Sequence, residues 1–155
     1  MTERSVVHST FTIERTYDRA PARVFAAWAD PAIKARWFGD GDVGPESTFD
    51  FRVGGHESNR SAPGADFAFG FDATYHDIVP DERIVFSYDL ARGGALVSVS
   101  LATVELQAVG KGTHLTYTEH GAFLDGLDDP DLRAKGTRDL LDALGKELER
   151  EPATA

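Results

Sequence analysis

The sequence predicts an α+β fold, in which a curved antiparallel sheet of about seven strands surrounds one long C-terminal helix and two short helices follow the first strand. Three observations predict it: runs with the two-residue alternation of strands, turn residues between most of these runs, and a final segment with helical periodicity. The strand-like runs are residues 9–17, 48–53, 57–61, 66–79, 83–89, 95–109 and 114–120.

The width of such a sheet predicts a partly hollow interior. Seven strands about 4.8 Å apart span roughly 33 Å, whereas a helix with its side chains is only about 10 Å wide. Because one helix cannot cover that face, we expect the sheet to curl around the helix. The remaining space must then be filled by large side chains or left as a pocket.

The first strand leads into two short helices. Pro21 suits the first turn of one helix, and Asp30 is a good N-cap for the next, which begins at Pro31. Each helix has an apolar face, which includes Trp28 in the first and Trp37 in the second. Helices this short are unstable alone, so we expect them to dock on a broad apolar surface.

The later strands form a meander with unusually aromatic faces. Glycine and proline residues separate the runs at the spacings of antiparallel hairpins. Alternation places each aromatic stripe on one side of its strand. The stripes are Phe49, Phe51 and Val53 in one strand, Phe67, Phe69, Phe71, Ala73 and Tyr75 in another, Ile84, Phe86 and Tyr88 in the next, and Leu115 and Tyr117 in the last.

The final helix has clear start signals and two internal glycines. Asp129 is a candidate N-cap, Pro130 occupies the first helical position, and the pattern continues to about Arg150. Gly136 and Gly145 each destabilise the helix by about 1 kcal/mol relative to alanine. Close packing against the sheet is the favoured reason for them, and room for a ligand is the alternative. The expected buried stripe consists of Arg133, Thr137, Leu140, Leu141, Leu144 and Leu148.

Length and hydropathy predict one domain without a membrane span. At 155 residues the chain can bury a single substantial core. We expect residues 1–155 to form that domain, with an ordered core over 8–149 and a fraying tail at 150–155. No apolar run approaches the roughly 20 residues of a transmembrane helix, and the first residues lack a signal-peptide core. These features predict a cytoplasmic protein.

Charge and cysteine content restrict the partners. The formal net charge is −10 and no basic cluster offsets it, so we expect no nucleic-acid binding. The absence of cysteine excludes disulfides, thiolate nucleophiles and zinc–thiolate sites. An acidic surface favours solubility and could also contact a basic protein. A protein partner or a homodimer therefore remains open at this point.

Candidate reactive groups are few. Glu119 should point to the same side as Tyr117, near the pocket mouth, where it could act as a general base. A rim carboxylate bonded to backbone or water is the favoured alternative. His56 could also reach the pocket. The five histidines lack ligand spacing, and neither a phosphate loop nor a nucleophile elbow is present. The sequence therefore predicts no catalytic residue, no metal site and no cofactor.

Several segments resemble one known family, the bacterial activator-of-heat-shock-protein-ATPase homologues. That family lies within the START and birch-pollen-allergen-like helix-grip superfamily (SRPBCC). The resemblance covers nearly the whole chain and includes an uncharacterised subgroup. The segments that carry it are residues 20–25 (Ala-Pro-Ala-Arg-Val-Phe), Trp28, Asp30 and Pro31, Trp37 and Phe38, 50–55 (Asp-Phe-Arg-Val-Gly-Gly), 118–126 and 136–144.

The resemblance implies a fold but does not select a function. It implies a β-α-α-β6-α order, with the sheet gripping the final helix over an elongated hydrophobic cavity. Relatives in the superfamily include lipid and hormone carriers, polyketide cyclases and chaperone co-activators. The eukaryotic co-activators resemble this chain over one domain only, without their chaperone-binding domain, which weighs against a chaperone role.

Non-enzymatic binding of a small hydrophobic molecule, aromatic or lipid-like, is the favoured hypothesis. A cyclase- or dehydratase-like enzyme that uses Glu119 or His56 with a tyrosine is the first alternative. A chaperone co-activator or other protein-interaction module is the second. The residues expected to form the binding site are Trp28, Trp37, Phe38, Phe51, Phe69, Phe71, Tyr75, Phe86, Tyr88, Tyr117, Glu119, Phe123, Leu140 and Leu144.

Overall fold

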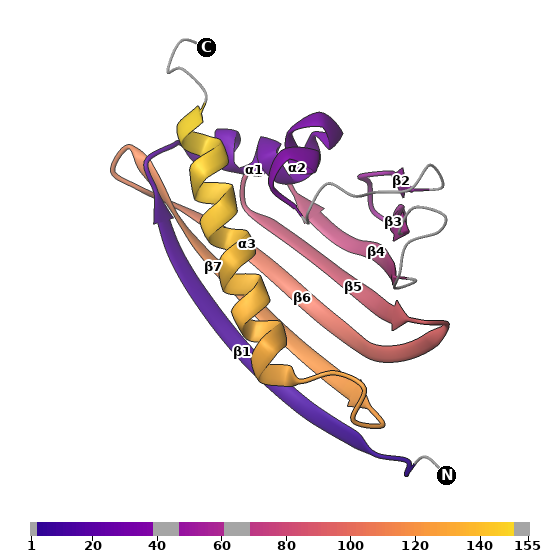
Figure 1. Ribbon diagram of the computed structural model, residues 1–155. Coiled ribbons are helices and arrows are strands. Elements are labelled where there is room, and N and C mark those ends of the chain that lie inside the picture. The colour runs from indigo at the N-terminus through magenta and orange to yellow at the C-terminus, as the bar shows by residue number, and fades with distance from the viewer. Residues whose placement is uncertain (1–2, 39–46, 61–68, 151–155) are drawn as a thin grey trace.

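The computed structural model describes residues 3–38, 47–60 and 69–150. Within these ranges the elements follow the expected β-α-α-β6-α order (Figure 1). They are β1 (Val6–Tyr17), α1 (Pro21–Ala29), α2 (Pro31–Trp37), β2 (Thr48–Phe49), β3 (His56–Arg60), β4 (Phe69–Val79), β5 (Arg83–Arg92), β6 (Ala95–Val109), β7 (Gly112–Leu124) and α3 (Pro130–Arg150).

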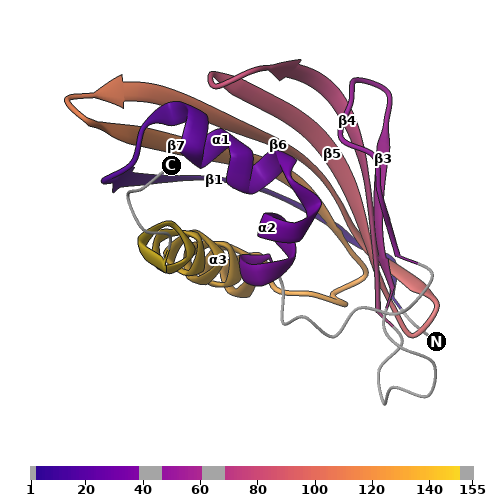
Figure 2. The ribbon, with the colours of Figure 1, turned by 90° about the horizontal axis from the view of Figure 1, so that it is seen from above.

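A single seven-stranded sheet carries the fold, in the order β1-β7-β6-β5-β4-β3-β2 with every neighbouring pair antiparallel. The sheet curves, and all three helices lie on its concave side (Figures 1 and 2). The long helix α3 runs along β1 and β7, while α1 and α2 cover one end of the same face. The predicted helix-grip architecture is therefore confirmed.

The helix caps agree with the sequence. The Asp30 carboxylate accepts a hydrogen bond from the Ala32 N–H at 2.9 Å, as an N-cap side chain should. The Asp129 carboxylate accepts one from the Asp131 N–H, also at 2.9 Å, at the start of α3. Helices α1, α2 and α3 all begin at a proline, whose fixed φ angle suits the first turn.

The expected strand over residues 48–53 is wrong beyond Phe49. After β2 the chain makes a tight turn, in which the Gly55 N–H donates to the Arg52 carbonyl oxygen at 2.7 Å. Gly54 has a φ of 82°, and a Cβ atom at Gly55 would lie 2.2 Å from the Asp50 carbonyl oxygen. Only glycines fit this geometry. Val53 consequently lies on the surface with 57% exposure and is not part of an inward stripe.

The edge strand β1 and its neighbour β7 are longer than predicted. β1 begins at Val6 and β7 runs from Gly112 to Leu124, so that Val6 lies opposite Leu124 across the ladder. The chain turns only after Leu124, at Asp125 and Gly126, which both have positive φ angles. The sequence pattern predicts that this strand ends at 120. Parts of three predicted segments lie outside the described residues, namely the strand residues 61 and 66–68 and the tail from 151.

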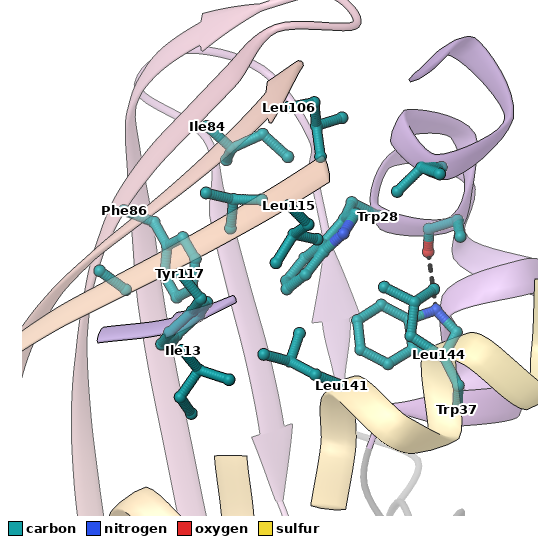
Figure 3. Packing of buried hydrophobic residues seen from close by; sticks show 14 of the residues in the cluster. Ile13, Trp28, Trp37, Ile84, Phe86, Leu106, Leu115, Tyr117, Leu141 and Leu144 are labelled. Carbon is teal, nitrogen blue, oxygen red and sulfur yellow. Dashed lines mark hydrogen bonds between the residues drawn. The ribbon is translucent and has the colours of Figure 1, made fainter. Parts of the chain in front are cut away.

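The tightly packed core lies where α1, α2 and the C-terminal half of α3 meet the sheet (Figure 3). Trp28 and Trp37 contact each other edge to face with ring centroids 4.8 Å apart. The Trp37 indole N–H donates to the Ala27 carbonyl oxygen at 2.9 Å, which joins α2 to α1. Leu141 and Leu144 bring α3 into the same cluster. The short helices thus find the apolar surface that their length requires.

Candidate functional site

A pocket of about 460 Å³ lies between the N-terminal half of α3 and the concave face of β4 and β5. Its wall on the sheet is aromatic because strand alternation directs every second residue inward. Its other wall is formed by α3 and by the turn before it. The lining residues are Phe38, Phe69, Phe71, Phe86, Tyr88, Leu90, Arg92, Tyr117, Asp128, Leu132, Arg133, Gly136, Thr137 and Leu140.

The aromatic wall is held together by ring contacts. Phe71 lies between Phe38, at a centroid distance of 5.6 Å, and Tyr88, at 5.1 Å. Phe86 continues the series, 6.1 Å from Tyr88. Such contacts are worth about 0.5–1.5 kcal/mol each beyond simple burial, so this wall is preformed.

Gly136 opens the helical side of the pocket. A Cβ atom built at Gly136 would find no neighbouring atom within 4 Å, and the residue lines the pocket. The favoured reason for this glycine, close packing, is therefore wrong. At Gly145, one half of the helix away, a Cβ would lie 3.2 Å from the Tyr17 ring, so close packing is correct there. One helix thus uses its two glycines in opposite ways.

A buried polar network forms the deep end of the pocket. Glu119, only 1% exposed, accepts hydrogen bonds from the hydroxyls of Tyr117 at 2.7 Å and Tyr88 at 2.9 Å. The Arg133 guanidinium donates to the Tyr88 oxygen at 3.0 Å and lies 3.7 Å from the Glu119 carboxylate. A second guanidinium nitrogen donates to Asp128 at 2.7 Å. The carboxylate is therefore compensated by two hydroxyls and one cation.

This network keeps its tyrosines neutral. Burial raises the pKa of Tyr88 well above its usual value, and the negative charge of Glu119 raises it further. Burial and Glu119 raise the pKa of Tyr117 in the same way. Since both hydroxyls donate to Glu119, a guest molecule could reach that carboxylate only by displacing them. The favoured expectation for Glu119, a rim group bonded to backbone or water, is wrong, because it is buried and bonded to side chains.

Comparison with known proteins identifies the family of the chain. Residues 18–149 match the family described as Activator of Hsp90 ATPase homolog 1-like protein. The chain belongs to this family. The resemblance seen in the sequence is thereby confirmed, and the shared region contains the helical cover and the whole pocket wall.

Solved structures of similar proteins support the assignment. The Mll3558 protein from Rhizobium loti is 57% identical, with a TM-score of 0.86 over 92% of this chain and 99% of that one. A putative uncharacterized protein from Rhizobium leguminosarum is 41% identical, with a TM-score of 0.90 over 97% and 100%. DynU16, a putative protein of the dynemicin biosynthetic locus, is 20% identical, covers 91% of this chain and 47% of that one, has a TM-score of 0.66, and shows the shared fold alone. No curated protein matches the chain.

In this member of the family, the predicted site residues fall into two groups. Those that line the pocket are Phe38, Phe69, Phe71, Phe86, Tyr88, Tyr117 and Leu140. The others lie elsewhere, in the packed core, behind the wall or beside α1: Trp28, Trp37, Phe51, Tyr75, Glu119, Phe123 and Leu144. His56 is exposed and bonds Thr74 at 3.1 Å, so it does not reach the pocket.

Sequence reasoning missed the polar part of the lining. The sequence pattern places Arg133 and Thr137 on the inward stripe of the helix. It does not indicate that they line the binding site. Asp128 and Arg92 stand next to turns, where no periodicity indicates direction. The place of Arg133 in the pocket lining could have been predicted, because it precedes Gly136 and Leu140 at helical spacing on the same face.

The sequence analysis did not predict a second buried cluster, which is formed by Lys34, Glu57 and Tyr75. Lys34 of α2 and Glu57 of β3, which are 5% and 4% exposed, form an ion pair with 2.6 Å between Nζ and Oε1. The Tyr75 hydroxyl donates to the same Glu57 oxygen at 2.5 Å. One signal was available, because Lys34 precedes Trp37 by three residues on the buried face of a helix.

The described residues show neither a metal-binding cluster nor a membrane-spanning helix. They group no three His, Asp or Glu side chains in a way that could hold a metal ion. Nor, in the same part of the chain, does any helix combine the length and apolar character needed to cross a membrane. The pocket beneath α3 and the Lys34 cluster are therefore the features that a functional account must address.

Proposed function

We propose that this protein binds a small, mostly apolar, aromatic or lipid-like molecule in the pocket beneath α3, without changing it chemically. Pockets of this size, lined by aromatic and aliphatic side chains with a few polar groups, are the usual form of small-molecule sites. Burial of roughly 200 Å² of apolar ligand surface would contribute about 5 kcal/mol before the costs of association.

The observation that carries the proposal is the open space at Gly136. A helix of this length gains stability from alanine at such a position, so the glycine has a helical cost that packing does not explain. The missing side chain enlarges the pocket at the point where α3 faces the aromatic wall. A guest ring inserted there would contact Phe71 and Tyr88 on one side and the helix backbone on the other.

The accessible polar groups suit orientation better than catalysis. Asp128 is the carboxylate in the described lining, and its charge is matched by Arg133 at 2.7 Å. Glu119 lies behind the Tyr88 and Tyr117 hydroxyls. A general acid or base needs hydrogen-bond reach to the reacting group, which this arrangement denies to Glu119. The cyclase-like alternative therefore receives less support than binding.

The decisive experiment uses two substitutions at one position. Gly136→Phe should fill the pocket and weaken the binding of naphthols and medium-chain fatty acids by about tenfold or more, about 1.4 kcal/mol. Gly136→Ala adds one methyl group and should retain binding within a few-fold. Native mass spectrometry and thermal-shift titration would measure both. Equal binding by the two variants, or no binding by the natural protein to either ligand class, would overturn the proposal.

The same samples distinguish binding from catalysis. Ligands released by denaturing the complexes should have unchanged masses and unchanged chromatographic retention. A product that forms with the natural protein and disappears in Gly136→Phe would replace the binding proposal with the enzymatic one.

A further inference from the structure

A second pocket of about 250 Å³ lies on the other side of α2, against β2 and β3. Among the residues that the structure describes, it shares no lining residue with the pocket beneath α3. Its lining is more polar and includes both members of the buried ion pair. The residues are Pro31, Lys34, Ala35, Ser47, Thr48, Phe49, Glu57 and Asn59.

The Lys34 amine is surrounded by groups that orient it and exclude water. Its Nζ donates to the Glu57 carboxylate at 2.6 Å and to the Tyr75 oxygen at 3.2 Å. The ring centroids of Phe38 and Phe49 lie 4.4 and 4.9 Å from the same nitrogen. The amine is thus fixed by contacts from β3 and β4, from β2, and from the end of its own helix.

This setting makes the amine easier to deprotonate than an exposed lysine. Burial lowers the pKa of Lys34, and the adjacent Glu57 only partly offsets that effect. The titratable groups that face the amine are Glu57 from β3 and Tyr75 from β4, while Phe49 of β2 and Trp28 of α1 present uncharged rings. Burial raises the pKa of Tyr75, so its hydroxyl stays protonated. Desolvation in an apolar pocket is one of the ways by which enzymes make a lysine nucleophilic, and the Glu57 carboxylate, 2.6 Å from Nζ, can accept the proton that the amine must lose.

We propose that Lys34 forms an imine with small, neutral aldehydes or ketones that enter this second pocket. Glu57 takes a proton from the ammonium, and the freed amine attacks the carbonyl carbon while the proton passes to the carbonyl oxygen. The carbinolamine then loses that oxygen as water, and a protonated imine remains. Overall, ammonium and carbonyl give iminium and water, and the Glu57 carboxylate becomes the counterion of the new cation.

Reductive trapping tests the proposal within the natural protein. Propanal or benzaldehyde with cyanoborohydride at neutral pH should convert the imine to a stable secondary amine, which peptide mass spectrometry locates. Lys111, Lys135 and Lys146 are exposed and serve as internal controls. We expect Lys34 to be labelled faster than each of these three lysines, because its lowered pKa leaves a larger neutral fraction at neutral pH. Labelling of Lys34 at or below the rate of these three lysines would overturn the proposal.

Three further measurements separate this chemistry from the general reactivity of lysines. The preference for Lys34 should vanish in urea, where the pocket is lost; a preference that persists there would show local sequence reactivity and overturn the assignment. In Glu57→Gln the group that raises the pKa of Lys34 is gone, so the midpoint of the labelling rate should move to lower pH. An unmoved midpoint would contradict the role of Glu57. Lys34→Met with Glu57→Gln removes both charges together and should show only surface labelling.

Discussion

The C-terminal half of α3 rests on side chains from α1, α2 and β1, whereas its N-terminal half faces β4 and β5 across a pocket. In the first region Leu144 is fully buried and the Tyr17 hydroxyl donates to the Leu141 carbonyl oxygen at 2.7 Å. In the second region the helix residues that line the pocket include Arg133, Gly136 and Thr137. The same helix is thus a packing element at one end and a pocket wall at the other.

The difference between these regions follows from where the short helices lie. α1 and α2 cover one end of the concave face, and their tryptophans occupy the space between α3 and the sheet (Figures 2 and 3). The aromatic stripes of β4 and β5 continue past that cover through Phe71 and Tyr88. Those rings therefore face α3 across a space that no tryptophan fills, which is the geometric origin of the pocket.

The largest expected effect tests whether both regions exclude water. Burial raises the pKa of Tyr17 in the packed region and of Tyr88 and Tyr117 beside the pocket, and Tyr75 behaves likewise. A raised folded-state pKa gives stability that is fully present below the unfolded value near pH 10 and is lost as pH rises above it. Above pH 10 each of these tyrosines should lower the free energy of unfolding by about 1.4 kcal/mol per pH unit. The four together should lower it by about 5 kcal/mol per pH unit. Lys34 has the opposite effect, because its lowered pKa makes the free energy of unfolding rise with pH. This effect involves one proton and ends at about pH 10.5, where the lysine of the unfolded chain also loses its proton.

Urea unfolding at several alkaline pH values, combined with ultraviolet titration of the tyrosines, measures this slope. Natural protein and Tyr88→Phe form the matched pair, because the substitution removes one titrating group beside the pocket. If Tyr88 ionised near pH 10 while the protein stayed folded, the deep end of the pocket would be wet, and the two regions would differ in solvation as well as in packing.

A pair of leucines in α3 compares the regions directly. Leu144→Ala should lower the free energy of unfolding by about 3 kcal/mol, because it leaves a cavity in a closed core. Leu140→Ala borders an existing pocket and should cost about 1 kcal/mol, while ligand binding is retained. Urea denaturation of both variants measures the difference. Equal costs would mean that the pocket region is as tightly packed as the core.

The comparison also explains how much could be predicted from the sequence. Strand alternation and proline positions predicted the order of the elements, because these signals depend on local geometry alone. Alternation also told which rings face inward, so Phe71, Phe86 and Tyr88 were correctly directed. It did not tell which rings pack and which line a pocket, because that depends on where α1 and α2 dock. Trp28 and Trp37, predicted to line the site, are the side chains that close the other end.

Polar residues were predicted least well, for a different reason. Lys34 and Glu57 belong to separate elements that approach only in the folded sheet, so no sequence spacing connects them. Glu119 was placed on the correct face, but its tyrosine partners stand on β5 and β7, and its cation stands on α3. Hydrogen-bond partners of buried charges are a tertiary property, whereas inward direction is a property of one strand.

The smallest expected effect compares the two glycines of α3. Gly136→Ala should raise the free energy of unfolding by about 1 kcal/mol, because alanine favours the helix and a Cβ meets nothing within 4 Å. Gly145→Ala gains the same helical preference, but its Cβ would lie 3.2 Å from the Tyr17 ring, so the ring or the helix must shift. We expect the second variant to be less stable than the first by about 1 kcal/mol in urea denaturation. Equal stabilisation would show that the packed region yields as readily as the pocket, and the division of α3 into two functional halves would then rest on the pocket lining alone.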